Sequence, residues 1–388
     1  MSVYLDHAAT TPLRPEVLQA MQPYLTEHFG NPSSIHGIGR RARLGLDEAR
    51  EAVAQALGAK PREIVFTGGG TEADNLAIKG AAWAASARGR ELVVSSIEHK
   101  AVTQSVAVME RYGFRTTWLA VDRYGRVDPA DVASAIGEHT TLVSVMYANN
   151  EVGSVQPVAE IGAICRQGGA LFHVDAVQAA GFLPLDVDAL GADLLSLSGH
   201  KLHGPKGVGA LFVRQGTALL AQQSGGAQER QRRAGTENVA AAVGFAHALQ
   251  LAQQERAHEG ARLAALRDSL IAEMAALPGV SLTGHPTERL PNSASFVIDG
   301  VEGGDLVAAL DLEGIAASTG SACTTGSAEH SHVLLAMGLE PEVAHGSLRL
   351  TLGRGNDEDD VRLTVEATRR VLERMRGVGE RRREVASV

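Results

Sequence analysis

Cysteine, lysine and long apolar runs are scarce in this sequence of 388 residues. The two cysteines, Cys165 and Cys323, allow at most one disulfide, which excludes a small fold held together by disulfides. No apolar run approaches the roughly 20 residues that a bilayer-spanning helix needs, and residues 1–10 show no basic cluster followed by an apolar core. The sequence therefore predicts a protein with no membrane span and no secretion signal, located in the cytoplasm.

Positive charge is also in the minority. Lysine and arginine number 36 against 45 acidic residues, a net charge of −9 that disfavours nucleic acid as the main partner. Most of the basic residues are arginines. Chemistry that requires a primary amine is therefore limited to five lysines, which are Lys60, Lys79, Lys100, Lys201 and Lys206.

Short apolar runs alternate with helical patterns from about residue 40 to residue 215. This alternation is typical of a mostly parallel α/β sheet with helices on both faces. Ligands in such sheets bind beyond the carboxyl ends of the strands, so we look for chemistry in the residues that follow each run. The predicted strands are 64–67, 92–95, 142–146, 171–174, 194–197 and 209–213.

The C-terminal part has a different pattern. Residues 240–277 are expected to form a helix with at least one interruption, and Pro278-Gly279 ends it at a plausible hinge between two domains. Strands are predicted at 293–298, 315–318 and 348–352, followed by a helix from Asp357.

A glycine-rich turn follows the first predicted strand. Gly68-Gly69-Gly70-Thr71-Glu72 precedes a helix, and glycines at a helix start let backbone N–H groups approach an anion. The spacing matches neither a dinucleotide fingerprint nor a nucleotide-binding P-loop, so a small monophosphate fits better. A purely structural turn remains an alternative.

Polar residues follow two later strands. Asp175 and Gln178 come after the strand at 171–174, and Ser198, His200 and Lys201 come after the strand at 194–197. Asp175 could instead cap a helix, and Lys201 could be a solvated surface charge. An amine, an anion-binding loop and a buried carboxylate are together what pyridoxal phosphate requires, so we predict this cofactor.

Three further residues stand at candidate positions. His99 could stack on a heterocycle or transfer protons, or it could be structural. Asn150 could bind a substrate carboxylate or belong to an Asn-rich turn. Arg349 lies within an apolar strand and needs a planar anion, either a substrate carboxylate or an internal Asp or Glu.

The two cysteines have different surroundings. Cys165 lies on an apolar helical face and is expected to be buried. Cys323 is flanked by small and polar residues from Ser318 to Ala328, which bury little apolar surface, so we expect an exposed thiol on a mobile loop.

Several motifs in one order resemble a known family, the cysteine desulfurases. These are pyridoxal-phosphate enzymes of the class V aminotransferase group with the fold-type-I architecture, and the Ser/Gly/Thr-rich loop resembles their long-loop branch. The matching segments are 4–12, 30–34, 70–75, 98–99, 149–151, 173–178, 198–201, 233–236, 320–323 and 348–349.

The resemblance implies a function for each candidate residue. Lys201 would form the imine with the cofactor, His99 would stack on its ring, Asp175 would pair with the ring nitrogen and Gln178 would donate to the ring oxygen. Asn150 would also contact the cofactor and, with Arg349, hold the carboxylate of L-cysteine, while Cys323 would accept the sulfur. The implied phosphate ligands are Gly70, Thr71, Ser198, His200 and, from the neighbouring subunit of a homodimer, Thr236.

The resemblance also implies the domain division and the partners. A large α/β domain would span residues 14–258, and a smaller α+β domain would combine residues 1–13 and 259–388. The sulfur acceptor would be an iron-sulfur scaffold or another carrier. The alternatives are a selenocysteine lyase, an ordinary aminotransferase and a non-catalytic sulfur carrier or regulatory partner. A metal site at His330 and His332 is weaker, because no metal-binding spacing is present.

Overall fold

The computed structural model describes residues 2–320 and 330–386, with side chains up to residue 376. Its larger part contains a seven-stranded sheet in the order β2-β8-β7-β6-β5-β3-β4, in which β8 is antiparallel to both neighbours and the other pairs are parallel. The strands are β2 (Ile64–Thr67), β3 (Glu91–Ser95), β4 (Arg115–Leu119), β5 (Thr140–Ser144), β6 (Leu171–Asp175), β7 (Leu194–Ser198) and β8 (Gly209–Val213).

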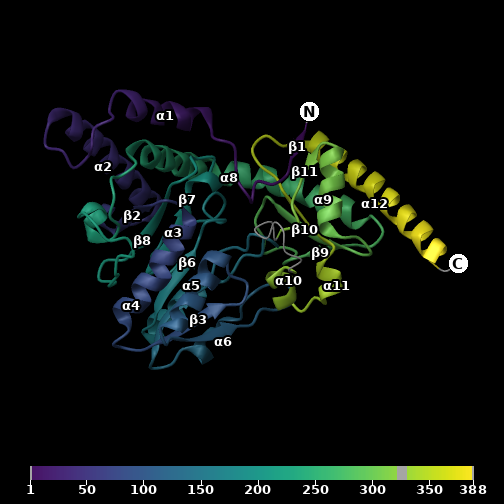
Figure 1. Cartoon of the computed structure of the whole chain (residues 1–388), viewed down its shortest axis with the longest axis horizontal. Coiled ribbons are helices and arrows are strands. Elements are labelled where there is room, and N and C mark those ends of the chain that lie inside the picture. Colours follow the sequence, from purple (N-terminus) through teal and green to yellow (C-terminus); the bar gives the residue numbers. More distant parts are fainter. Residues whose placement is uncertain (1, 321–329, 387–388) are drawn as a thin grey trace.

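Helices cover both faces of this sheet (Figure 1). Alternate residues of each strand face opposite sides, so that Phe66 and Phe212 join one apolar core while Val65 and Leu211 join the other. The first core is closed by α1 (Pro15–Thr26), α2 (Gly37–Leu57), α6 (Pro129–Ala135), α7 (Val158–Gly168) and the first part of α8 (Val239–Ala275). The second is closed by α3 (Gly70–Asn75), the π-helix η2 (Leu76–Gly80), α4 (Ala81–Ala85) and α5 (Lys100–Arg111).

The smaller part has its own core and sheet. Strands β9 (Val280–Thr283), β10 (Ser293–Ile298) and β12 (Ser347–Thr351) form an antiparallel sheet in the order β12-β10-β9. The remaining helices here are α9 (Gly303–Leu312), α10 (His332–Ala336), α11 (Pro341–Ala344) and α12 (Glu358–Ala386). Near the N-terminus, β1 (Val3–Tyr4) pairs in parallel with β11 (Ile315–Ala316), so the start of the chain belongs to this smaller part (Figure 1).

The predicted interruption in the helix near residues 240–277 is wrong. Helix α8 runs without a break over 37 residues from Val239 to Ala275. Its buried residues fall in two groups. The first group, which ends at Leu249, packs in the larger core, and the second, which begins at Leu263, packs in the smaller core. The polar stretch between them suggested a break because it crosses from one core to the other and needs no apolar stripe.

The predicted strands of the larger sheet are confirmed in place, with boundary shifts of one or two residues. The sequence analysis missed β4, which is largely exposed and carries little apolar pattern. No helix within the described residues is long and apolar enough to cross a lipid bilayer.

Candidate active site

A cavity of about 920 Å³ opens at the carboxyl edge of the seven-stranded sheet. The ends of β2, β3, β6 and β7 and the turns after them converge on it, as expected for a parallel α/β sheet. Its walls bring together nearly all the residues predicted to bind a cofactor, which are Gly70, Thr71, His99, Asn150, Asp175, Gln178, Ser198, His200 and Lys201.

The glycine-rich turn forms one wall of this cavity. Gly69 has a φ of 147°, a backbone conformation that only glycine adopts readily. A Cβ on Gly70 would lie 2.7 Å from Cγ2 of Val177 and 3.3 Å from Cβ of Ser198. The three glycines therefore allow the turn to pack closely beside the cavity, with the backbone of the turn not covered by side chains. This arrangement favours an anion-binding turn over a purely structural one.

Lys201 contacts the N-terminal segment of the chain. Its Nζ donates hydrogen bonds to the carbonyl oxygens of Ala8 and, at 2.8 Å, Ala9. Nε2 of Gln178 donates to the same Ala8 carbonyl at 3.0 Å. Lys201 is thus held by main-chain carbonyls at the cavity wall, which excludes the alternative of a solvated surface charge.

Asp175 ends β6 at the floor of the cavity. Burial raises the pKa of this carboxyl, while the nearby His99 and Lys201 act to lower it. Its Oδ1 accepts a hydrogen bond from the N–H of Val177 at 2.9 Å, and the chain then turns without forming a helix, so the alternative of a helix cap is not realised.

His99 has a structural contact as well as a place in the cavity wall. It is the N-cap of α5, and its Nδ1 accepts a hydrogen bond from the N–H of Ala101 at 3.1 Å. This contact fixes the ring at the cavity edge. The structural and the functional interpretations of His99 are therefore compatible.

Buried polar residues at the cavity wall and behind it were missed by the sequence analysis. His173 contacts Oγ of Ser144 at 2.9 Å and Oγ of Ser196 at 3.0 Å, and burial lowers its pKa to about 3. Oδ1 of Asp74 lies 3.6 Å from Nε2 of His173, and burial followed by the charge of Asp175 raises the pKa of Asp74 well above its usual value. Asp74 lies three residues after Thr71 on one helix, a spacing that places both on the same side.

Glu98 is the third buried carboxyl near the cavity. Its Oε1 accepts hydrogen bonds from Oγ of Ser95 at 2.5 Å and from the N–H of Met146 at 2.7 Å. Burial raises its pKa to about 8. Together with Asp74 and Asp175, it makes this edge of the sheet rich in carboxyl groups whose pKa values are raised by burial.

Arg349 lies behind the cavity wall rather than in it. Its Nη1 donates to the carbonyl of Asn150 at 2.9 Å, and its Nη2 pairs with Oδ1 of Asp6 at 2.7 Å. Of the two anionic partners that the sequence left open, the internal carboxylate is the one present here. Asn150 itself lines the cavity.

Of the other predicted site residues, Thr236 and Arg349 do not line this cavity. Thr236 is exposed on the segment that also carries Arg233, whose Nε pairs with Glu72 at 2.8 Å beside the glycine-rich turn. Cys323 lies outside the described residues. Cys165 is buried with 1% exposure, and burial raises its pKa to about 12, which confirms the prediction of an unreactive core thiol.

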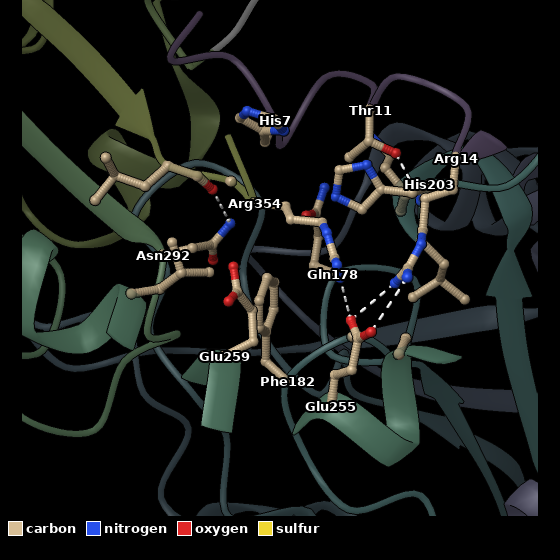
Figure 2. Close-up of a pocket in the computed structure, with 17 residues that line it drawn as sticks. His7, Thr11, Arg14, Gln178, Phe182, His203, Glu255, Glu259, Asn292 and Arg354 are labelled. Carbon is tan, nitrogen blue, oxygen red and sulfur yellow. Dashed lines mark hydrogen bonds and ion pairs between the residues drawn. The ribbon is translucent and has the colours of Figure 1, made fainter. Parts of the chain in front are cut away.

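A second cavity of about 60 Å³ lies near residues 7–14 (Figure 2). Glu255 of α8 pairs there with Arg14 at 2.8 Å and also with Arg354 of the smaller part. Gln178 and Lys201 line both cavities. The N-terminal residues therefore contact Lys201, which also lines the larger cavity.

The comparisons with known proteins identify the family. The chain belongs to the class-V aminotransferases, whose family model matches residues 3–363. Among its relatives, the cysteine desulfurase IscS of Dictyoglomus turgidum is 48% identical over 98% of this chain and 97% of the relative. The IscS of Methanosarcina thermophila is 49% identical over 97% and 93%, respectively.

A solved structure agrees with these relatives. A NifS-like protein superposes with a TM-score of 0.91 at 36% identity, covering 96% of this chain and all of the other. The predicted fold, a fold-type-I pyridoxal-phosphate enzyme with a mostly parallel sheet, is confirmed. The chain is a member of the cysteine desulfurase group within its family, and pyridoxal phosphate is its cofactor.

The residues of the larger cavity fit this cofactor. The uncovered backbone at Gly69 and Gly70 could accept a phosphate, Lys201 could provide the amine, and the buried Asp175 could provide a carboxylate for a ring nitrogen.

Proposed function

We propose that this chain is a cysteine desulfurase that converts L-cysteine to L-alanine and transfers the sulfur to Cys323. The observation that carries the proposal is the convergence of Lys201, Asp175 and the glycine-rich turn in one cavity. The chain is also 48% identical to a protein named cysteine desulfurase over nearly its whole length.

Residues around the cavity would hold the cofactor. Pyridoxal phosphate, when bound, supplies a ring that withdraws electron density from the amino acid. Asp175 would keep its ring nitrogen protonated, Gln178 would donate to its ring oxygen and His99 would lie against its face. The phosphate ligands would be Gly70, Thr71, Ser198 and His200. Lys201 would provide the amine that attaches it and afterwards move a proton at the substrate carbon.

Asn150 and Arg349 would hold the substrate. The side chain of Asn150 lines the cavity, and its carbonyl oxygen accepts a hydrogen bond from Arg349. A guanidinium group binds a carboxylate with paired hydrogen bonds, which would orient L-cysteine with its sulfur directed away from this anchor.

Cys323 would accept the sulfur as a thiolate. Its sulfur attacks the sulfur of the substrate, so that an S–S bond forms while the C–S bond of the substrate breaks. The electron pair of the broken bond would stay on the substrate carbon, which would take up a proton delivered by His99. The products are alanine and a persulfide on Cys323.

We further propose a homodimer in which Thr236 of the partner subunit completes the phosphate site. Thr236 is exposed and does not reach the cavity of its own chain, which supports this assignment. Large apolar side chains are also exposed on and between α1 and α2, including Phe29 at 69% and Ile35 at 90%. A second copy of the chain would cover such a surface.

The sulfur acceptor and the domain division are also part of the proposal. A cytoplasmic iron-sulfur scaffold or another sulfur carrier would take the persulfide sulfur from Cys323. Residues 14–258 would form the large domain, and residues 1–13 with 259–388 the small one. The two separate apolar cores that α8 connects support this division.

Alanine formation tests the proposal. Purified wild-type protein loaded with cofactor should convert L-cysteine to alanine, and Cys323→Ala should lose more than about 100-fold of this activity because the nucleophile is gone. A persulfide trapped by alkylation should map to Cys323. Cys165→Ala serves as the matched control and should retain the activity, since this thiol is buried in the core.

Two outcomes would contradict the proposal. Alanine release at the wild-type rate by Cys323→Ala would exclude the persulfide step. A wild-type protein that releases alanine from selenocysteine but not from cysteine would instead be a selenocysteine lyase.

A further inference from the structure

Arg349 is a buried cation whose surroundings are built from distant parts of the chain. The residue is 3% exposed. Its Nη1 donates to the carbonyl oxygens of Asn150 at 2.9 Å and Gly320 at 3.3 Å, and its Nη2 donates to Oδ1 of Asp6 at 2.7 Å. Asp6 and Arg349 are 343 residues apart in sequence.

These contacts do not use every donor of the buried guanidinium group. A guanidinium group has five N–H donors, and the three acceptors around Arg349 use the Nη1 side and one Nη2 hydrogen. Nε has no hydrogen-bond partner among the residues that the structure describes. The Nε–H and the remaining Nη2–H can form a two-pronged donor that matches a carboxylate.

Asp6 is itself held in place. The hydroxyl of Tyr4 donates to the carbonyl oxygens of Asp6 at 3.0 Å and Thr10 at 2.9 Å. The N–H of Ala8 donates to Oγ1 of Thr351 at 2.9 Å, at the end of the strand that carries Arg349. The Asp6 carboxylate therefore stands at a defined position relative to the guanidinium group, although 20% of its side chain is exposed.

The charge of Asp6 alone would not favour substrate binding. A carboxylate beside Arg349 neutralises its positive charge and so weakens the attraction for a second carboxylate. Any benefit of Asp6 must come from the hydrogen bond that fixes the orientation of the guanidinium group. The position of the acceptor oxygen and its charge therefore have opposite effects on substrate binding.

We infer that Asp6 is a positioning residue for substrate recognition, which orients Arg349 so that its free donors receive the carboxylate of an α-amino acid. The inference rests on the proposed function, in which Arg349 binds the carboxylate of L-cysteine. It assigns to the N-terminal segment a direct part in substrate affinity, beyond its contact with Lys201.

Three substitutions at Asp6 test this inference in the holoenzyme. Asp6→Ala removes the acceptor and should raise the KM for L-cysteine about tenfold, with kcat changed less than about threefold. Asp6→Glu keeps the charge but moves the carboxylate by one carbon, so its KM should also rise. Asp6→Asn keeps an acceptor oxygen in place without the charge, and its KM should stay within about threefold of wild type.

A binding measurement separates orientation from folding. The bound cofactor's absorbance is titrated with L-alanine and with ethylamine, which lacks the carboxylate. Asp6→Ala should weaken the response to L-alanine about tenfold and leave the response to ethylamine unchanged. A merely structural defect would weaken both. Glu16→Ala, which removes an exposed partner of Arg14, is the control and should alter neither.

The failures of the inference and of the proposed function can be told apart. An Asp6→Ala or Asp6→Glu variant with a KM at or below the wild-type value would overturn the inference, provided that Arg349→Ala raises KM. If Asp6→Ala is not recovered folded, Asp6→Glu decides alone. A wild-type protein that forms no alanine from cysteine contradicts the proposed function itself.

Discussion

Buried carboxyl groups are stabilised in different ways in two regions of this molecule. At the carboxyl edge of the large sheet, Asp74, Glu98 and Asp175 are buried without an arginine partner in the part of the chain that the structure describes, and burial raises the pKa of each. Beneath the segment that carries Thr236, Glu229 is equally buried but forms two hydrogen bonds of 2.7 Å with Arg50.

The difference reflects what each region has to do. Glu229 begins three consecutive residues with positive φ (44°, 55° and 64°), a backbone conformation that costs free energy unless its surroundings enforce it. An ion pair fixes such a backbone firmly. At the sheet edge the carboxyl groups are held instead by hydrogen bonds from hydroxyl and N–H groups, and burial leaves their pKa values raised.

Removal of Lys201 should have the largest effect. The charge of Lys201 acts against the rise that burial causes in the pKa of Asp175. Lys201→Ala should lose the covalent link to the cofactor and more than about 10³-fold of the activity. Borohydride reduction followed by peptide mapping would show the loss. The exposed Lys60 provides the control, and labelling of Lys201→Ala at another lysine would refute the assignment.

Among the effects on stability, removal of Glu229 should have the largest. Glu229→Ala leaves the buried Arg50 without its counter-ion and should lower the free energy of unfolding by about 3–5 kcal/mol. Denaturant titration measures this loss. The double substitution Arg50→Met with Glu229→Leu should recover much of it, because no unpaired charge remains. Equal losses in the single and double variants would mean that the ion pair is not what fixes this segment.

The carboxyl group of Glu98 should make stability depend on pH. Its pKa of about 8 in the folded protein lies above its usual 4.5, so between these values the folded state holds a proton that the unfolded state releases. The stability that this group contributes is full below about pH 4.5 and is lost as the pH rises to about 8.

Replacement with glutamine should remove this dependence. Glu98→Gln carries no titrating group and should eliminate a loss of about 1 kcal/mol per pH unit between about pH 6 and pH 8. Unfolding at several pH values measures the slope, with the exposed Glu160→Gln as control. An unchanged slope in Glu98→Gln would show that Glu98 is not protonated in the folded protein.

Asp74→Asn should have the smallest effect. An asparagine resembles a protonated aspartic acid and can keep the hydrogen bond that Ser196 makes with this side chain. The free energy of unfolding at neutral pH should change by less than about 1 kcal/mol, against about 1–3 kcal/mol for Asp74→Ala. A larger loss in Asp74→Asn than in Asp74→Ala would mean that Asp74 is ionised, and the contrast between the two regions would fail.

The sheet and most of the cofactor site could be predicted from sequence because they depend on local patterns. The strands at Ile64–Thr67 and Gly209–Val213 have the predicted bounds, and the residues after the strands meet in one cavity because parallel strands end at the same edge. Lys201 and Asp175 could be connected with the cofactor from their residue types and positions, and the family resemblance then supplied the roles proposed for Gln178 and Thr236.

Contacts between distant residues could not be predicted in this way. Asp6 gave no signal as the partner of Arg349, since nothing local connects two residues 343 positions apart. Asp74, Glu98 and His173 were missed for a related reason. Their burial follows from the packing of helices and loops over the sheet, and no periodicity within any one segment reports it.

The pairing of β1 with β11 can form only late in the synthesis of the chain. On the ribosome, Val3 and Tyr4 emerge long before Ile315 and Ala316 exist, so the first strand waits without its partner while the large sheet is made. The chain therefore brings Asp6 to Arg349 only near the end of translation. A nascent protein that has folded its sheet still lacks this contact, so the ion pair between the two ends of the chain is among the last to form.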